Sequence, residues 1–84
     1  MNKEIKEFIE KGANLEHQRW AKWQEYLHSK CIKNKDGSLT IPIEFVKHWE
    51  SQIVSPYSDL SEREKESDRK EVIKYLPLIN QLLK

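Results

Sequence analysis

Apolar residues recur at helical spacing along most of the chain, and the breaks between them divide it into separate helices. Residues 3–11 carry three apolar side chains on one side, and Gly12 follows them where a helix commonly ends. Asn14 is a suitable N-cap, which predicts a second helix over residues 15–33. The apolar arc of that second helix contains Trp20, Trp23, Leu27 and Cys31.

The middle of the chain contains a turn and a third helix. Residues 34–38 read Asn-Lys-Asp-Gly-Ser, in which Asp-Gly is a strong turn signal. Residues 39–41 are too few to support a sheet, so we expect one extended turn or arm around residues 34–41. Pro42 suits the first position of a helix that continues to Val54, and Ser55-Pro56 ends it.

The fourth helix begins at a capping box formed by Ser61 and Glu64, and Pro77 ends or kinks it. An apolar tail follows, made of Leu78, Ile79, Leu82 and Leu83. These elements predict an all-α fold, a small bundle of four to five helices. With 84 residues, the chain forms one domain, residues 1–84. Because so small a domain cannot cover this tail, we also expect a homodimer.

Positions 65, 69, 72 and 76 of the fourth helix have the spacing of a buried stripe, but only half of that stripe is apolar. Val72 and Leu76 are apolar, whereas Lys65 and Arg69 are charged. A charge that faces a core must be paired, hydrogen-bonded or hydrated. We therefore expect Lys65, Arg69 and the neighbouring Asp68 to face the second helix and to mark a functional site. The alternative is a solvated helix stabilised by local ion pairs.

Composition excludes several functions. Charged residues make up 35% of the chain but nearly cancel, which argues against binding a nucleic acid polymer. A single cysteine fits a reducing cytoplasm, and no apolar run is long enough to span a membrane. His17 and His28 are too far apart along one helix to share a metal ion, and we expect no metal and no cofactor. The carboxylates suggest no acid–base pair, so we expect no enzymatic activity.

Two blocks of the sequence resemble a known family. Residues 15–20 read Leu-Glu-His-Gln-Arg-Trp, and residues 56–69 read Pro-Tyr-Ser-Asp-Leu-Ser-Glu-Arg-Glu-Lys-Glu-Ser-Asp-Arg. This pattern resembles the RyR domain, the repeat of ryanodine receptors, which is also found alone in bacteria and their phages. The resemblance covers residues 15–79. The family's Gly-rich aromatic segment and its His-Pro are replaced here by residues 36–42 and a helix that contains Trp49.

The resemblance implies a helical, non-catalytic module in the cytoplasm, of the host cell if a phage encodes it. Such domains are linked to nucleotide-derived signals in bacterial immunity, and receptor repeats of this type bind adenine nucleotides or serve as protein contact surfaces. One hypothesis is therefore a module that binds an adenine or cyclic nucleotide, such as a phage sponge that sequesters an immune signal. The alternative is a protein-interaction module, such as a phage inhibitor of a host defence complex that binds a host protein.

The nucleotide hypothesis assigns a role to each candidate residue. A base would stack on an exposed aromatic side chain, Tyr57 or Trp23. Cationic groups would neutralise phosphate, and Asp68 would orient Arg69 or accept a hydrogen bond from a ribose hydroxyl. The candidate phosphate-binding residues are Lys65, Arg69, Arg19 and His17.

Overall fold

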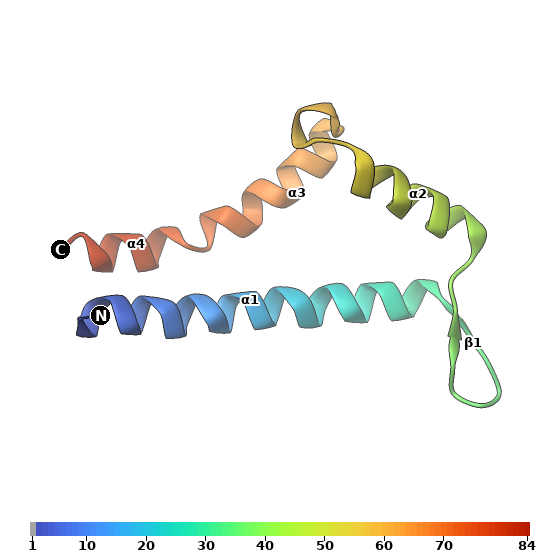
Figure 1. Ribbon diagram of the computed structural model, residues 1–84, viewed down its shortest axis with the longest axis horizontal. Helices are drawn as coiled ribbons and strands as arrows, with labels where there is room; N and C mark the ends of the chain where they lie inside the picture. The colour runs from blue at the N-terminus through green and yellow to red at the C-terminus, as the bar shows by residue number, and fades with distance from the viewer. Residues whose placement is uncertain (1) are drawn as a thin grey trace.

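One long helix forms the base of the molecule, and the rest of the chain returns along it as separate short elements (Figure 1). The computed structural model describes residues 2–84. The helical elements are α1 (Lys3–Lys30), α2 (Ile43–Val54), the 3-10 turn η1 (Tyr57–Asp59), α3 (Glu62–Ile73) and α4 (Leu76–Leu82). Two short strands, β1 (Ile32–Lys33) and β2 (Leu39–Thr40), lie between α1 and α2. The chain is thus mostly helical, as the sequence predicted.

The predicted break at Gly12 is wrong, because α1 runs without interruption through residues 12–14. A glycine that ends a helix adopts a left-handed conformation, and of the two glycines only Gly37 has a positive φ. Gly12 instead lies beside the side chain of Tyr75, the residue before α4. A Cβ placed on Gly12 would lie 3.5 Å from the Tyr75 Cε1 atom, which is ordinary van der Waals contact. Gly12 therefore marks a close packing contact between two helices.

Replacing Gly12 with alanine is expected to stabilise the fold. A Cβ at 3.5 Å from Tyr75 is in ordinary van der Waals contact, and alanine in a helix interior is favoured over glycine by about 1 kcal/mol. Urea unfolding followed by circular dichroism should show that gain for Gly12→Ala. Gly12→Leu is the matched control, because its longer side chain must displace the tyrosine ring and should lower stability. A loss of stability in Gly12→Ala would contradict this packing.

The predicted extended arm is a short β-hairpin, so the expectation that residues 39–41 are too few to pair is wrong. β1 pairs antiparallel with β2, with Ile32 opposite Thr40. The turn between them is the predicted one: Gly37 has φ +90°, and the Asp36 carboxylate accepts hydrogen bonds from the Ser38 amide and hydroxyl. The second helix also ends three residues earlier than predicted, at Lys30, because β1 begins at Ile32.

Local signals placed the later helices correctly. In α3 the Ser61 hydroxyl accepts a hydrogen bond from the Glu64 amide, and the Glu64 carboxylate accepts one from the Ser61 amide, which is the predicted capping box. α2 begins at Ile43, one residue later than predicted, and Pro42 is its N-cap residue. Pro77 lies in the first turn of α4, so the chain bends at Lys74 and Tyr75.

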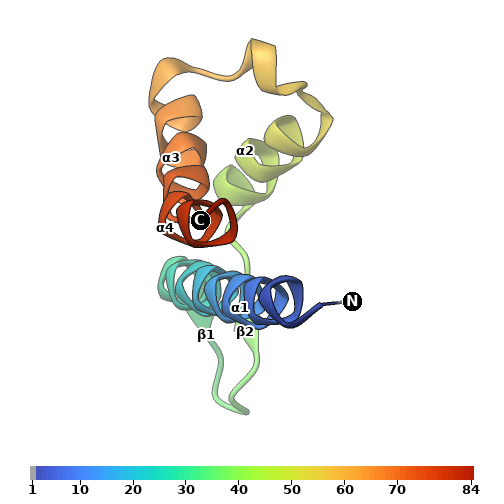
Figure 2. The ribbon, with the colours of Figure 1, turned by 90° about the vertical axis from the view of Figure 1, so that its left-hand side faces the viewer.

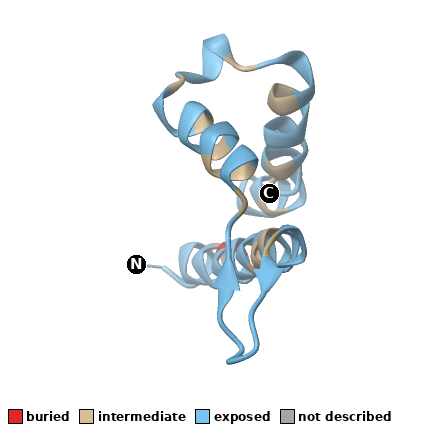
Figure 3. Cartoon of the chain, turned by 90° about the vertical axis from the view of Figure 1, so that its right-hand side faces the viewer, coloured by how far each residue is buried: buried red, intermediate tan, exposed pale blue. Residues whose placement is uncertain are grey.

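The helices do not form the predicted bundle around a shared core. α4 packs on the N-terminal half of α1, where Phe8, Leu78 and Leu82 line one hollow and Lys11 Nζ donates to Gln81 Oε1 over 2.9 Å. α2 and α3 instead rise from α1 as two arms (Figure 2). Among residues 2–84 only Gly12 is fully buried (Figure 3).

The dimensions of the chain match this open arrangement. The radius of gyration is 17.1 Å, whereas a compact domain of this length has about 12 Å. The accessible surface is 7161 Å², roughly 1,900 Å² more than the value of about 5,300 Å² expected for a folded monomer of this mass. The apolar faces that the sequence contains are therefore largely exposed.

Candidate functional site

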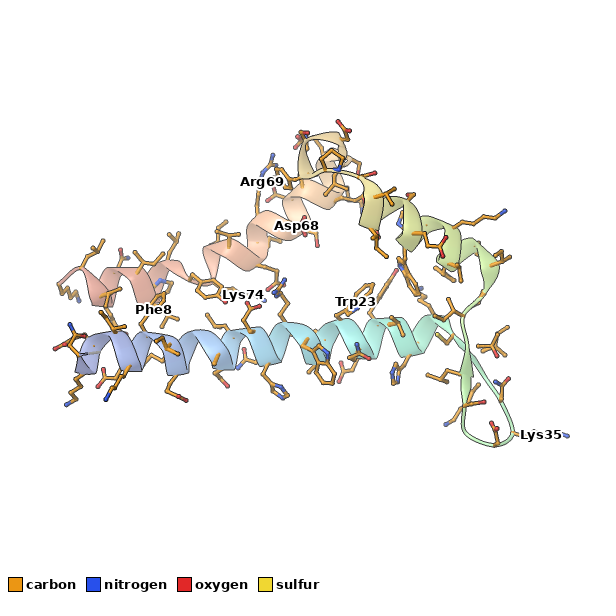
Figure 4. The ribbon with its side chains drawn as sticks, in the orientation of Figure 1. Phe8, Trp23, Lys35, Asp68, Arg69 and Lys74 are labelled. Carbon is orange, nitrogen blue, oxygen red and sulfur yellow. The ribbon has the colours of Figure 1, made fainter. Side chains whose placement is uncertain are left out.

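The arms and α1 enclose an open cleft of about 390 Å³. Trp23 projects into it from α1, and Asp68 projects from α3 on the opposite side (Figure 4). Its lining consists of Trp23, Gln52, Leu60, Glu64, Ser67 and Asp68. The two charged side chains in this lining are both carboxylates, so the cleft favours a cationic or neutral group over a phosphate.

An aromatic cluster closes the hairpin side of the cleft. Trp23 of α1 meets Trp49 of α2 edge to face, with ring centroids 5.6 Å apart. Phe45 and Tyr26 extend the cluster, at 5.5 Å from Trp49 and 5.7 Å from Trp23. Edge-to-face and offset pairs at these distances are favourable beyond the area they bury. This cluster holds α2 against α1.

A polar contact joins the two arms, α2 and α3. The Gln52 side-chain amide of α2 donates to the Glu64 carboxylate of α3. The same carboxylate accepts from Ser61, so one glutamate caps α3 and anchors α2. These hydrogen bonds, that of Gln52 first, lower the pKa of Glu64.

The junction of α3 and α4 is tied to α1 by a polar triad. The Tyr75 hydroxyl donates to the Glu16 carboxylate, which also pairs with Arg19 one turn along α1. The Tyr75 hydrogen bond and, after it, Arg19 lower the pKa of Glu16. The same hydrogen bond raises the pKa of Tyr75. Both pKa shifts favour the protonation states in which the contact forms, an ionised Glu16 and a protonated Tyr75.

The Glu16–Tyr75 contact is expected to contribute stability only in a middle range of pH. A lowered glutamate pKa means that the contribution is present above the ordinary value of 4.5 and is lost as pH falls below it. A raised tyrosine pKa means that the contribution is lost as pH rises above 10.0. The stability difference between the native chain and Tyr75→Phe, measured by urea unfolding across pH, should therefore be largest between these values. A difference that does not change with pH would contradict the assignment.

The structure divides the seven candidate ligand residues into three groups. Trp23 and Asp68 share the cleft. Tyr57, Lys65 and Arg69 lie at the tip of α3, where the Lys65 ammonium is 5.8 Å from the Tyr57 ring centroid. His17 and Arg19 lie on α1, where His17 stacks on Trp20 at 6.0 Å. A single site that contains all seven residues does not form.

The expectation that Lys65, Asp68 and Arg69 all face the second helix is wrong for Lys65, which lies over the Tyr57 ring outside the cleft, and for Arg69. Its guanidinium lies on the outer side of α3 (Figure 4) and donates to Glu62 over 3.0 Å and to Glu66 over 3.3 Å. Asp68 is therefore not the residue that orients it. These two carboxylates, Glu62 first, raise the pKa of Arg69. Its charge is largely compensated by its own helix.

Sequence reasoning missed two groups of residues. It did not single out Glu16 and Tyr75, which meet only because α4 returns along α1. It treated Trp23 as a candidate for base stacking and Trp49 as a residue of a separate helix, whereas the two form one contact. No group of three metal-binding side chains lies together anywhere in residues 2–84. Within that range, no helix combines the length and apolar character needed to cross a membrane.

No protein-family model, curated protein or solved structure matches the chain. The resemblance to the RyR domain therefore stays a prediction. The surface geometry alone must support any function that is assigned.

Proposed function

We propose that this chain is a protein-association module that buries its open apolar surface against another polypeptide. The observation that carries the proposal is the accessible surface of 7161 Å², with no apolar side chain fully buried in residues 2–84. Many of the large apolar side chains are exposed, and contiguous exposed apolar patches on soluble proteins mark interaction surfaces. The four- to five-helix bundle predicted from the sequence would then be completed by helices of the partner.

The exposed apolar residues are arranged as helix faces, which supports this proposal. On α2, Phe45 and Trp49 face the cleft side, whereas Ile53 and Val54 are each 80% exposed. On α4, Leu78 faces α1, whereas Leu76 and Leu83 point away from it. Each of these helices thus has one apolar side against its own chain and a second one without a partner. Such two-sided apolar helices are typical of buried positions in an assembly.

Small-angle scattering and thermal unfolding of the full chain test the proposal. We expect either particles that contain more than one chain or, where single chains persist, a broad and non-cooperative transition. Both results follow if the isolated chain cannot cover its apolar faces. A single chain with a radius of gyration near 12 Å and a sharp transition would overturn the proposal, because such a chain closes on itself.

A second candidate function is the binding of an adenine-type nucleotide at the tip of α3. The observation that favours it is the Lys65 ammonium above the half-exposed Tyr57 ring, with Arg69 close by. A base would stack on Tyr57 and a phosphate would bind Lys65, the cation of this group that is not engaged by a carboxylate within salt-bridge distance in residues 2–84. The acidic cleft would take no part in this site.

Thermal unfolding with a panel of adenine and cyclic nucleotides tests this second function. A true ligand at 100 times its dissociation constant should add about 2.7 kcal/mol of stability. Lys65→Ala should abolish that gain, and Lys70→Ala, which removes a cation from the same helix, should preserve it. A panel without any stabilising nucleotide would exclude the site.

A further inference from the structure

A continuous outward stripe runs along α3 and α4. Its members are Lys65, Arg69, Val72, Leu76, Ile79 and Leu83. Their spacing alternates between four and three residues, which is the a/d pattern of a coiled-coil heptad. The apolar members are exposed by 67%, 51%, 38% and 79% from Val72 to Leu83, so this stripe has no partner within its own chain.

The backbone between α3 and α4 stays in the right-handed helical region although the chain bends there. Lys74 and Tyr75 keep right-handed helical dihedral angles, and the Tyr75 amide donates to the Val72 carbonyl over 3.0 Å. The inner side of α4 is occupied separately, because Tyr75 packs on Gly12 and Leu78 lies beside Phe8. The outer side extends from Lys65 to Leu83, which are 19 residues and about 27 Å of helix. Both sides of α4 are therefore built for packing, and only one has its partner in the chain.

From this geometry we infer that the stripe is a homodimer surface, on which α3 and α4 of two copies pack antiparallel. The inference rests on the proposed association function and specifies its partner. Antiparallel pairing places position 72 against 76, 69 against 79, and 65 against 83 of the other copy. A two-fold axis near residue 74 relates the copies, so each contact occurs twice.

The charges on the stripe select the antiparallel direction. Parallel pairing would stack Lys65 on Lys65 and Arg69 on Arg69 of the other copy, which places like charges together. Antiparallel pairing places these side chains over Leu83 and Ile79, which their aliphatic stems can cover. It also brings both cations near the C-terminal, negative end of the other copy's α4. Glu62 and Glu66 keep Arg69 neutralised at the rim of this contact.

The size of the exposed surface agrees with a second copy of the chain as the partner. The excess over a compact monomer is roughly 1,900 Å² per chain, which for two chains amounts to about 3,800 Å². Permanent homodimers bury about 2,000–5,000 Å² in total, so two copies can remove the excess without a further partner.

Sedimentation of full-length variants tests the surface. The native chain should sediment at twice the 10.1 kDa of one chain. Leu76→Glu places a charge at the centre of the contact and should weaken the dimer at least about 30-fold. Ile32→Glu is the matched control, since it puts the same charge on an exposed apolar position of the hairpin, away from α3 and α4, and should leave the dimer intact.

A cross-link tests the direction and does not depend on a disruptive substitution. In a Cys31→Ser background, Val72→Cys chains mixed with Leu76→Cys chains should form a disulfide between the two kinds of chain. Val72→Cys alone should not, because antiparallel pairing sets its two copies apart along the axis. A disulfide in Val72→Cys alone would overturn the antiparallel arrangement.

The outcomes separate this inference from the proposed function. If Leu76→Glu remains dimeric, the chain still associates but this surface is wrong. If the native chain is single and unfolds without cooperativity, self-association is wrong while a different protein partner remains required. A compact, cooperative single chain overturns both.

Discussion

Replacing Trp49 with alanine is expected to detach α2 from α1 and to lower the free energy of unfolding by about 2–3 kcal/mol. Replacing a fully buried tryptophan with alanine lowers the free energy of unfolding by about 3–5 kcal/mol. Trp49 is only half-buried, so we expect a smaller loss. The substitution also removes the edge-to-face pair with Trp23 and the contact with Phe45. Few other contacts hold α2, and the Gln52–Glu64 hydrogen bond joins it to α3 rather than to α1.

Trp20→Ala is the matched control for this prediction. Trp20 is 59% exposed and stacks on His17 of its own helix, so its removal should change stability by less than about 0.5 kcal/mol. Urea unfolding followed by circular dichroism compares the two variants. Near-ultraviolet circular dichroism should lose the tryptophan-pair signal in Trp49→Ala alone. Equal losses of stability in both variants would show that the Trp23–Trp49 contact does not hold the arm.

Features that depend on a few neighbouring residues could be predicted from the sequence. The Ser61–Glu64 capping box and the Asp36-Gly37 turn both formed where expected, because their hydrogen bonds join residues within one turn of chain. The C-terminal end of α2 at Val54 was predicted for the same reason, since Ser55 and Pro56 stop a helix locally.

Gly12 shows why other boundaries could not be predicted. After three apolar residues at helical spacing, a glycine signals either a helix end or a close helix contact. The choice between them depends on Tyr75, which lies far along the chain and reaches Gly12 only once α4 packs on α1. A contact between distant segments therefore overrode a local signal.

The stripe on α3 and α4 shows a different limit. Its periodicity predicted that Lys65, Arg69, Val72 and Leu76 share a face of one helix, whereas the structure ends α3 at Ile73 and begins α4 at Leu76. The sequence does not say what covers the face, and we assigned it to the chain's own core. In the structure it points outward, so the same pattern becomes evidence for a partner.

The candidate ligand residues were grouped by charge and aromatic character, and the structure brings only some of them together. Trp23 and Asp68 line one cleft from opposite sides, and Lys65 lies beside Tyr57. Arg69 turned to Glu62 and Glu66 because these carboxylates lie seven and three residues away on its own helix. Such local pairs compete with any site built from residues that are far apart in the sequence, and composition alone does not show which contacts form.

The melting temperature of the native chain is expected to rise with its own concentration. If folding and dimer formation are coupled, each tenfold rise in concentration adds about 1.4 kcal/mol to the stability of the dimer. Between 1 and 100 μM, the gain of about 2.7 kcal/mol should raise the melting temperature by roughly 6–10 °C for a dimer of this size. A scan of circular dichroism against temperature at several concentrations measures this shift directly.

Leu76→Glu provides the control, because a chain that cannot dimerise should melt at one temperature over the same range of concentrations. At 1 μM the native chain and this variant should converge, since dilution and the added charge remove the same contact. Leu76 is half-exposed within its own chain, so the glutamate adds little cost to the monomer itself. A native melting temperature that does not change with concentration would mean that the outward stripe has no second copy to cover it, and that the stability of the chain comes from contacts within one chain.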